Sequence, residues 1–279
     1  MRRWGLALAG LGLPGLGLAA LGLAGLGLAA LAAGDAGART PVDVELVLAV
    51  DMSQSMDAGE HELQRAGYLA ALRHPDVLGA IRSGIYGRGA IAYVEWGGPL
   101  SQAVRVPWTL VEDAASAGGF AAALAAQPVR TIRGTSISGA LAFAAGLFED
   151  NGFDGLRRVI DVSGDGPNSS GDPVAPTRDA VLGQGLIVNG LPIMLREPGY
   201  TPWSIPDLDL YYADCVIGGP GAFVLPVDDP AQLADAIRQK LVLEIAGRPP
   251  TLMPVTADAR PPRIDCLIGE KLLQRWGGP

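Results

Sequence analysis

Side chains with oxygen donors gather in three short clusters of this sequence. Asp51, Ser53 and Ser55 alternate directly after an apolar run, Thr135 precedes a helical pattern, and Asp165 follows a second apolar run. Alternating residues of a tight loop can point the same way, so the first cluster offers one carboxylate and two hydroxyls together. Oxygen ligands without His or Cys select Mg²⁺, Mn²⁺ or Ca²⁺. These five residues are therefore a candidate divalent-cation site, with Mg²⁺ as the favoured ion and Mn²⁺ or Ca²⁺ as alternatives.

Each cluster taken alone also has a purely structural interpretation. Ser53 and Thr135 are of the residue types that cap helix N-termini by accepting hydrogen bonds from free backbone N–H groups. Asp165-Gly166 is an ordinary turn signal. The metal interpretation therefore depends on all three clusters meeting at one edge of the fold.

The sequence around the clusters alternates between expected strands and expected helices. The strands are expected at 42–50, 89–96, 102–111, 158–163, 186–193 and 222–227, and the helices at 60–72, 114–126, 137–148, 173–182 and from 228 onward. A short connection at 97–99 makes the second and third strands antiparallel neighbours. This order predicts an α/β fold with a doubly wound, mostly parallel, Rossmann-like sheet flanked by helices and one antiparallel edge strand. Ligands bind such sheets at the carboxyl ends of the strands, where the three clusters fall.

The three clusters together resemble a known metal site. D-x-S-x-S after a central strand, a Thr before a helix and an Asp after the next parallel strand are similar to the metal-ion-dependent adhesion site (MIDAS) of von Willebrand factor type A (VWA) domains. Residues 42–246 fit the order of elements in that fold. The resemblance implies that Ser53 and Ser55 bind the cation directly, and Thr135 directly or through water. It further implies that Asp51 and Asp165 act largely through water and that one coordination position stays open for a partner's carboxylate.

Several phrases also resemble an exported bacterial VWA-like family of unknown function. They are "YVEWGGP", "GTSISGA", "VIDVSGDGPN" and "CVIGGPGAF". Glu95 and Asp161 depart from ordinary VWA domains because they place acids inside strands. Each is either a group that adds charge to the metal site or a buried acid paired with an Arg, since a buried charge needs a partner.

The two ends of the chain differ in composition from the predicted domain. Residues 1–33 combine a basic start, Arg2-Arg3, with a long uncharged run and small residues suited to cleavage, as a signal peptide does. The alternative is an uncleaved membrane anchor, because about 20 apolar residues span a bilayer. In either case the rest of the chain is expected outside the cytoplasm, periplasmic or secreted. Residues 247–279 are rich in Pro and are expected to form an extended tail.

Charge and cysteine content restrict the partners. Residues 1–33 hold two of the 21 Lys and Arg and none of the 29 Asp and Glu, so the remainder carries a formal charge of −10. Such a surface repels nucleic acid and anionic membranes. Cys215 and Cys266 are the two cysteines, and an isolated pair in an oxidising compartment predicts a disulfide. With only His61 and His74 in the chain, no zinc cluster of the usual spacing can form.

These features support three functional hypotheses. The favoured one is a non-enzymatic binding module whose cation bridges to an acidic group on a protein or another ligand. The second is a metal-dependent hydrolase in which Asp51 or Asp165 activates a metal-bound water. The third is a structural envelope protein in which the metal only ties loops together.

The leader generates a prediction about the exported protein. If residues 1–33 are a cleaved signal peptide, mass spectrometry of the exported protein will find its N-terminus between about Ala33 and Arg39. Recovery of the full chain as an integral membrane protein would show that the leader is an anchor.

Overall fold

The apolar run before Asp51 forms the central strand β2 (Val44–Asp51), in which every residue is buried. In this computed structural model the sheet has the order β4-β3-β2-β6-β7. Its other strands are β3 (Gly89–Trp96), β4 (Gln102–Val111), β6 (Arg158–Gly164) and β7 (Ile187–Pro192). All neighbours pair parallel except β3 and β4, which pair antiparallel. The expected mostly parallel α/β sheet with one antiparallel edge strand is confirmed.

The structure describes residues 39–196, 204–247 and 263–276. The leader at 1–33 and all the prolines of the expected C-terminal tail lie outside these residues. Within them, a small second sheet pairs β1 (Thr40–Val42) with β5 (Phe153–Gly155). No helix in the described part of the chain is both long and apolar enough to cross a membrane.

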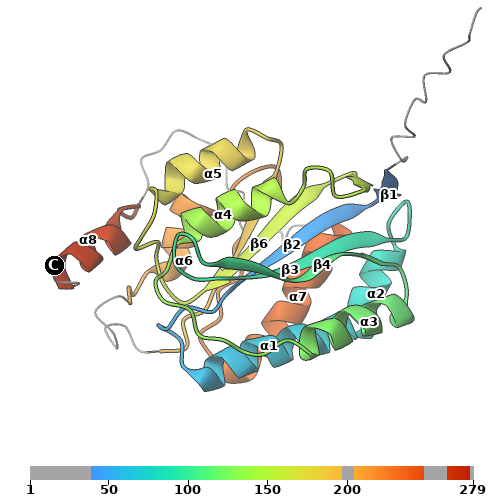
Figure 1. Cartoon of the computed structure of the whole chain (residues 1–279), viewed down its shortest axis with the longest axis horizontal. Helices are drawn as coiled ribbons and strands as arrows, with labels where there is room; N and C mark the ends of the chain where they lie inside the picture. The colour runs from blue at the N-terminus through green and yellow to red at the C-terminus, as the bar shows by residue number, and fades with distance from the viewer. Residues whose placement is uncertain (1–38, 197–203, 248–262, 277–279) are drawn as a thin grey trace, which may run out of the picture. The chain divides into compact units, whose positions relative to one another are not determined.

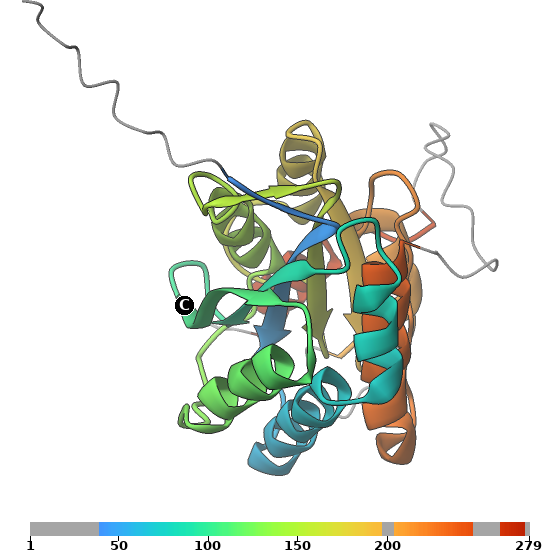
Figure 2. The same ribbon diagram turned by 90° about the vertical axis from the view of Figure 1, so that its right-hand side faces the viewer.

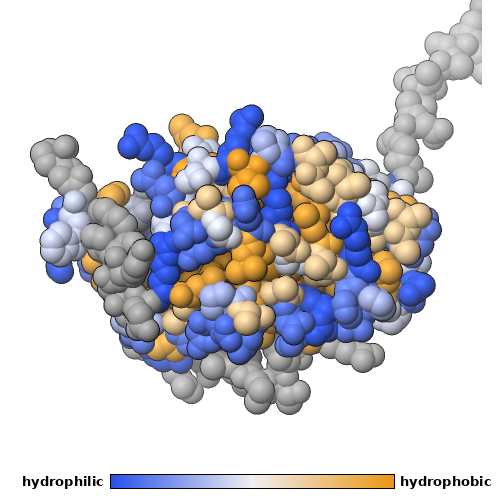
Figure 3. Space-filling view, turned by 90° about the horizontal axis from the view of Figure 1, so that it is seen from below, coloured by the Kyte–Doolittle hydropathy of each residue, from blue (hydrophilic) through white to orange (hydrophobic). Residues whose placement is uncertain are grey.

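Helices cover both faces of the sheet (Figures 1 and 2). On one face lie α1 (Ala58–Leu72), α2 (Pro75–Arg82), α3 (Ala114–Ala125) and α7 (Leu233–Ala246), which begins after a 3₁₀ turn at Pro230–Gln232. On the other face lie α4 (Ile137–Gly146), α5 (Val174–Leu182) and α6 (Leu208–Tyr211), which continues into a π-helical turn at Tyr212–Val216. Viewed from the side of α1 and α3, hydrophobic and hydrophilic residues are interspersed on the surface (Figure 3).

The segment 222–227 was expected to be a strand and is not one. It touches β7 only through isolated parallel bridges, Gly190 to Val224 and Ile193 to Val227. Pro192 and Pro226 fall between these bridges, and proline has no amide N–H to donate to a ladder. The apolar residues there pack as expected, but the backbone does not complete a sixth strand of the main sheet.

Besides the short α6, which begins in a segment expected to be a loop, two helices appear where the sequence pattern did not predict them. His74-Pro75 ends α1 as expected, but Pro75 also begins α2, because the first turn of a helix needs no N–H from that residue. The second helix, α8 (Ile268–Trp276), lies in the C-terminal segment that was expected to be extended.

A disulfide ties the start of the α8 segment to the domain. The expected Cys215–Cys266 bond is present and joins residues 51 positions apart in the sequence. The guanidinium of Arg263 adds a contact of 2.8 Å to Asp214. Gly269 packs so closely that a Cβ there would lie 2.0 Å from the Asn168 carbonyl oxygen. These contacts hold α8 against the loop that follows β6.

The two acids inside strands are both paired with cations. Glu95 lies between Arg65 and Arg105, and its carboxylate contacts both guanidinium groups. Asp161 pairs with Lys240, whose ammonium is buried against it. Glu95 therefore follows the expectation of a buried acid paired with Arg, whereas the partner of Asp161 is a lysine.

A second acid, Glu244, shares the buried Lys240 ammonium with Asp161. Its carboxyl also accepts a hydrogen bond of 3.0 Å from the Asn189 amide. Burial, and next the charge of Asp161, raise the pKa of Glu244 to about 8 from its ordinary value of 4.5. At neutral pH the Glu244 carboxyl therefore favours its protonated form.

The Glu244 proton makes stability depend on pH. The folded chain holds a proton that the unfolded chain releases above about pH 4.5, so stability is lost as pH rises toward 8. Glu244→Gln resembles the protonated side chain. Between pH 5 and pH 9 the free energy of unfolding should therefore fall by roughly 2–4 kcal/mol less in this variant than in the wild type. Urea unfolding at both pH values measures it, with the exposed Glu62→Gln as control. Equal pH dependence in the wild type and Glu244→Gln would contradict the assignment.

The disulfide should contribute directly to stability. Replacing both Cys215 and Cys266 by Ser should lower the free energy of unfolding by about 2–4 kcal/mol, because the bond restricts a long loop in the unfolded chain. Denaturant unfolding with and without a reductant measures this. Reduction should lower the free energy of unfolding of the wild type to that of the double variant. If the reductant leaves the wild-type value unchanged, the prediction is refuted.

Candidate metal site

The three predicted clusters meet at one edge of the sheet. Because β2 and β6 are neighbouring parallel strands, with Val50 opposite Ser163, their carboxyl ends lie side by side. This pairing places Asp51 next to the loop that carries Asp165. The loop before α4 joins them through Ile132, whose amide donates to Met52 at 2.7 Å. The expected convergence of the clusters is therefore present in the fold.

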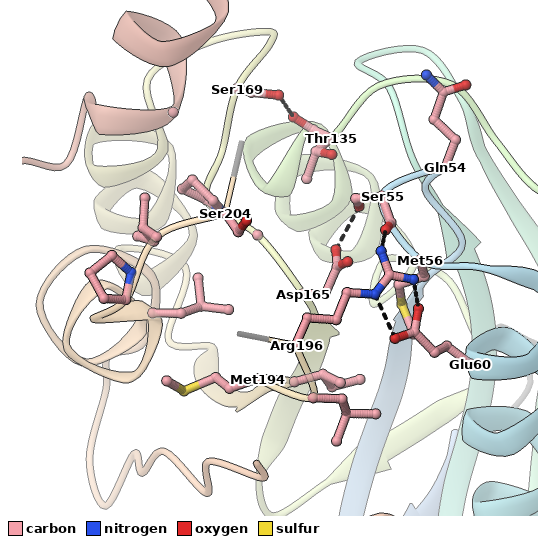
Figure 4. A pocket seen from close by; sticks show the side chains of 18 of the residues that line it. Gln54, Ser55, Met56, Glu60, Thr135, Asp165, Ser169, Met194, Arg196 and Ser204 are labelled. Carbon is pink, nitrogen blue, oxygen red and sulfur yellow. Dashed lines mark hydrogen bonds and ion pairs between the residues drawn. The ribbon is translucent and has the colours of Figure 1, made fainter. Parts of the chain in front are cut away.

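A chain of short hydrogen bonds links four of the five predicted residues. The Ser53 and Ser55 hydroxyl oxygens are 2.6 Å apart, and the Ser55 hydroxyl donates to Asp165 Oδ1 at 2.6 Å. The Ser53 amide donates to Asp51 Oδ1 at 2.7 Å. Figure 4 shows Ser55 and Asp165 pointing toward each other. Asp51 and Ser53 are fully buried, whereas Ser55 and Asp165 face a cavity.

Thr135 occupies the rim of the same cavity. It lines the cavity together with Ser55 and Asp165. Its carbonyl oxygen accepts from the amides of Ser169 and Ser170 at 3.0 and 3.1 Å, which joins the loop before α4 to the loop after β6. The N-cap of α4 is the next residue, Ser136, rather than Thr135. The capping interpretation of Thr135 is therefore wrong.

The carboxyl groups of the site are poorly compensated. Burial, and then the charge of Asp165, raise the pKa of Asp51 well above its ordinary value. Burial raises the pKa of Asp165 to about 6, against the opposing effect of the Ser55 hydroxyl. Asp51 Oδ2 is buried and has no hydrogen-bond partner among the described residues. A buried acceptor without a partner costs free energy, and a bound cation would remove that cost.

The donor set fits a hard cation that uses hydroxyl as well as carboxylate oxygens. Within the described residues, no three His, Cys, Asp or Glu side chains gather into a metal site. Any cation at this edge would therefore depend on Ser53, Ser55 and Thr135 in addition to the two acids. Gly164 is part of this arrangement, since a Cβ there would lie 2.8 Å from Asp51 Oδ2. A side chain at this position would fill the space beside that oxygen.

Three further residues, which the sequence pattern did not single out, hold the Asp51 loop in place. From α1, the Gln64 amide donates to the Asp51 carbonyl at 3.1 Å, and His61 Nε2 lies 3.1 Å from the Ser53 carbonyl. After β7, Arg196 donates to the Ser55 carbonyl at 2.5 Å. His61 and Gln64 are buried polar residues three apart on one helix, a spacing that could have indicated a shared partner.

Arg196 is itself held by an acid from α1. Its Nε donates to Glu60 Oε1 at 2.9 Å, and Figure 4 shows the guanidinium between Ser55 and Glu60. Desolvation would lower the pKa of this guanidinium, but Glu60 outweighs it and raises the pKa instead. Arg196 follows a parallel strand just as Asp165 does, and this position at the edge of the sheet was the signal available in the sequence.

Known proteins of similar fold give the family context. The structure of proximal thread matrix protein 1 from the mussel byssus with a zinc-occupied MIDAS motif matches with a TM-score of 0.54 and 14% identity, covering 75% of this chain and 49% of that chain. The pilus adhesin SpaC from Lactobacillus rhamnosus GG also gives a TM-score of 0.54, with 13% identity, 74% of this chain and 31% of that chain. This chain thus spans half or less of these relatives. At such identities the likeness establishes the fold.

The sequence comparison establishes the family. No curated protein sequence matches the chain at a significant level. A family model described as protein of unknown function (DUF1194) matches residues 41–249, which include all five candidate metal residues. The chain therefore belongs to the DUF1194 family, and its described domain has a VWA-like α/β fold.

Proposed function

We propose that this chain is an exported, metal-dependent binding module. In this proposal Asp51, Ser53, Ser55, Thr135 and Asp165 hold a divalent cation, with Mg²⁺ favoured, and one coordination position accepts an acidic group from a partner. The observation that carries the proposal is the hydrogen-bonded set of Ser53, Ser55 and Asp165 beside the buried, unpartnered Asp51 oxygen. When bound, the cation would supply the positive charge that these oxygens lack.

The surroundings favour binding over hydrolysis. His61 is buried, and its Nε2 contacts the Ser53 carbonyl instead of the cavity. His74 caps α2. Among the described residues, three acids line the cavity: Glu60 is engaged by Arg196, Asp165 by Ser55, and Asp228 is exposed to solvent. A hydrolase would need a general base that is free to take a proton from water, and neither histidine is placed for that role.

Export is part of the proposal and has three independent supports. Residues 1–33 have the composition of a signal peptide, and Cys215 and Cys266 form a disulfide, which persists in oxidising compartments. The two proteins of similar fold are named as a pilus adhesin and a byssus matrix protein. Those names describe binding or structural roles outside the cell.

The metal site is tested by an isosteric substitution. Asp51→Asn keeps the size of the side chain but removes its charge, so Mg²⁺ and Mn²⁺ affinity should fall at least about 30-fold, equivalent to about 2 kcal/mol. Isothermal titration calorimetry measures it. Asp154→Asn is a matched control, because Asp154 is exposed on β5 at the opposite end of the central strand. Circular dichroism verifies that each variant is folded.

The same titrations test the open coordination position with acetate as the probe. Acetate should tighten Mg²⁺ binding by the factor by which Mg²⁺ tightens acetate binding, because binding energies are reciprocally linked. Equal heats of Mg²⁺ binding in the wild type and Asp51→Asn would disprove the site. Metal binding without any acetate coupling would favour a cation that only ties the loops together.

A further inference from the structure

A cavity of about 640 Å³ opens beside Ser55 and Asp165. This volume lies within the range of pockets that hold small molecules. Its lining is chemically mixed and includes hydroxyls and carboxyls of the candidate metal site. Apolar side chains also line it, and three of them, here called the apolar wall, are Met194, Ile205 and Leu273. Figure 4 shows Met194 on the same cavity as Asp165, at a distance from Ser55 and Thr135.

Leu273, the residue of the apolar wall that comes from α8, is held in place by several contacts. Leu273 belongs to α8, which the Cys215–Cys266 disulfide attaches to the domain. The Asn168 amide donates to Glu270 Oε1 at 2.7 Å, and the Gly269 backbone packs against the Asn168 carbonyl. Several independent contacts therefore keep Leu273 in position at the cavity.

The charges that line the cavity determine where a carboxylate group of a ligand can bind. Without a cation, the Asp165 carboxylate would repel a carboxylate ligand; a cation held by the site would attract one. In the same cavity, Met194, Ile205 and Leu273 offer apolar surface, and burying the apolar atoms of a ligand against it is favourable. An acidic side chain on a protein has a short stem and would leave much of this apolar wall uncovered.

We propose that the cavity binds a small amphiphilic carboxylate. Its carboxylate completes the shell of the bound cation, and its apolar body lies against Met194, Ile205 and Leu273. This inference rests on the proposed metal site and adds the chemical class of the ligand. It makes the length of the apolar body, in addition to the acidic head, a determinant of affinity.

A homologous series of monocarboxylates tests the inference. Acetate, butyrate, hexanoate and octanoate are titrated into the Mg²⁺-loaded protein, at concentrations below aggregation of the longer acids. Affinity should rise about fourfold for each methylene that becomes buried. A series without Mg²⁺ should show binding at least tenfold weaker for every acid, because the other cation that lines the cavity in the described part of the chain, Arg196, is already paired with Glu60.

Matched variants identify the wall. Leu273→Ser should weaken octanoate binding about five- to tenfold and leave acetate unchanged. Leu267→Ser is the control, because Leu267 is 40% exposed, Leu273 is 39% exposed, and Leu267 does not line the cavity. Met194→Ser removes apolar surface that follows β7 and does not belong to α8. It should therefore also weaken octanoate binding, even if α8 shifts in the Leu273→Ser variant.

The outcomes separate this inference from the proposed function. If Mg²⁺ binds and all four acids bind equally well, the metal site stands and the amphiphile proposal is overturned. It is likewise overturned if octanoate binds equally to the wild type, Leu273→Ser and Met194→Ser. Absence of Mg²⁺ binding overturns the proposed function and, with it, this inference.

Discussion

Parallel pairing of β2 and β6 is the constraint on which the candidate site depends. It fixes Asp51 and Asp165 at adjacent strand ends, and they cannot separate without breaking the register of the central sheet. Burial raises the pKa of both carboxyls, so the fold holds them where their charged forms are unfavourable. Ser53 and Ser55 bridge the gap with hydroxyls, but hydroxyls carry no positive charge. A concentration of negative potential at this edge follows from the topology itself, and it is the physical reason for proposing a cation there.

The charges in the neighbouring strands do not add to this potential. Glu95 contacts Arg65 and Arg105, and Asp161 contacts Lys240. The charge of each acid is therefore compensated by its own cationic neighbours. Removing one partner from such a pair is costly because it leaves an uncompensated buried charge. The question that these two acids raised in the sequence has a structural answer: they belong to the packing of the sheet against its helices. The charges that act on the two carboxyls of the candidate site come from the site itself and from Glu60 and Arg196 beside it.

The central sheet was predictable because each of its strands is a local pattern. Runs such as 44–51 and 89–96 are apolar except for Glu45, Asp51 and Glu95, and their order fixes the edge at which Asp51 and Asp165 meet. Segment 222–227 has the same apolar character but fails as a strand, because two prolines face each other in its register with β7. Helix α8 was missed because prolines dominate the composition of its surroundings. For Arg196 the sequence offered only its position after a parallel strand, and Leu273 could not be assigned to the cavity, since only the folded chain brings α8 to it.

The position of α8 along the chain has a consequence for how the cavity is assembled. The five candidate metal residues are synthesised early and belong to strands and loops that can pair as soon as β6 has emerged. Leu273 comes far later, after α7, and reaches the cavity only when its segment has docked on the Asn168 loop. The cation residues and the apolar wall are therefore completed at different times. A chain folded only as far as α7 would have the cation residues together with Met194 and Ile205, and it would gain Leu273 when the α8 segment docks.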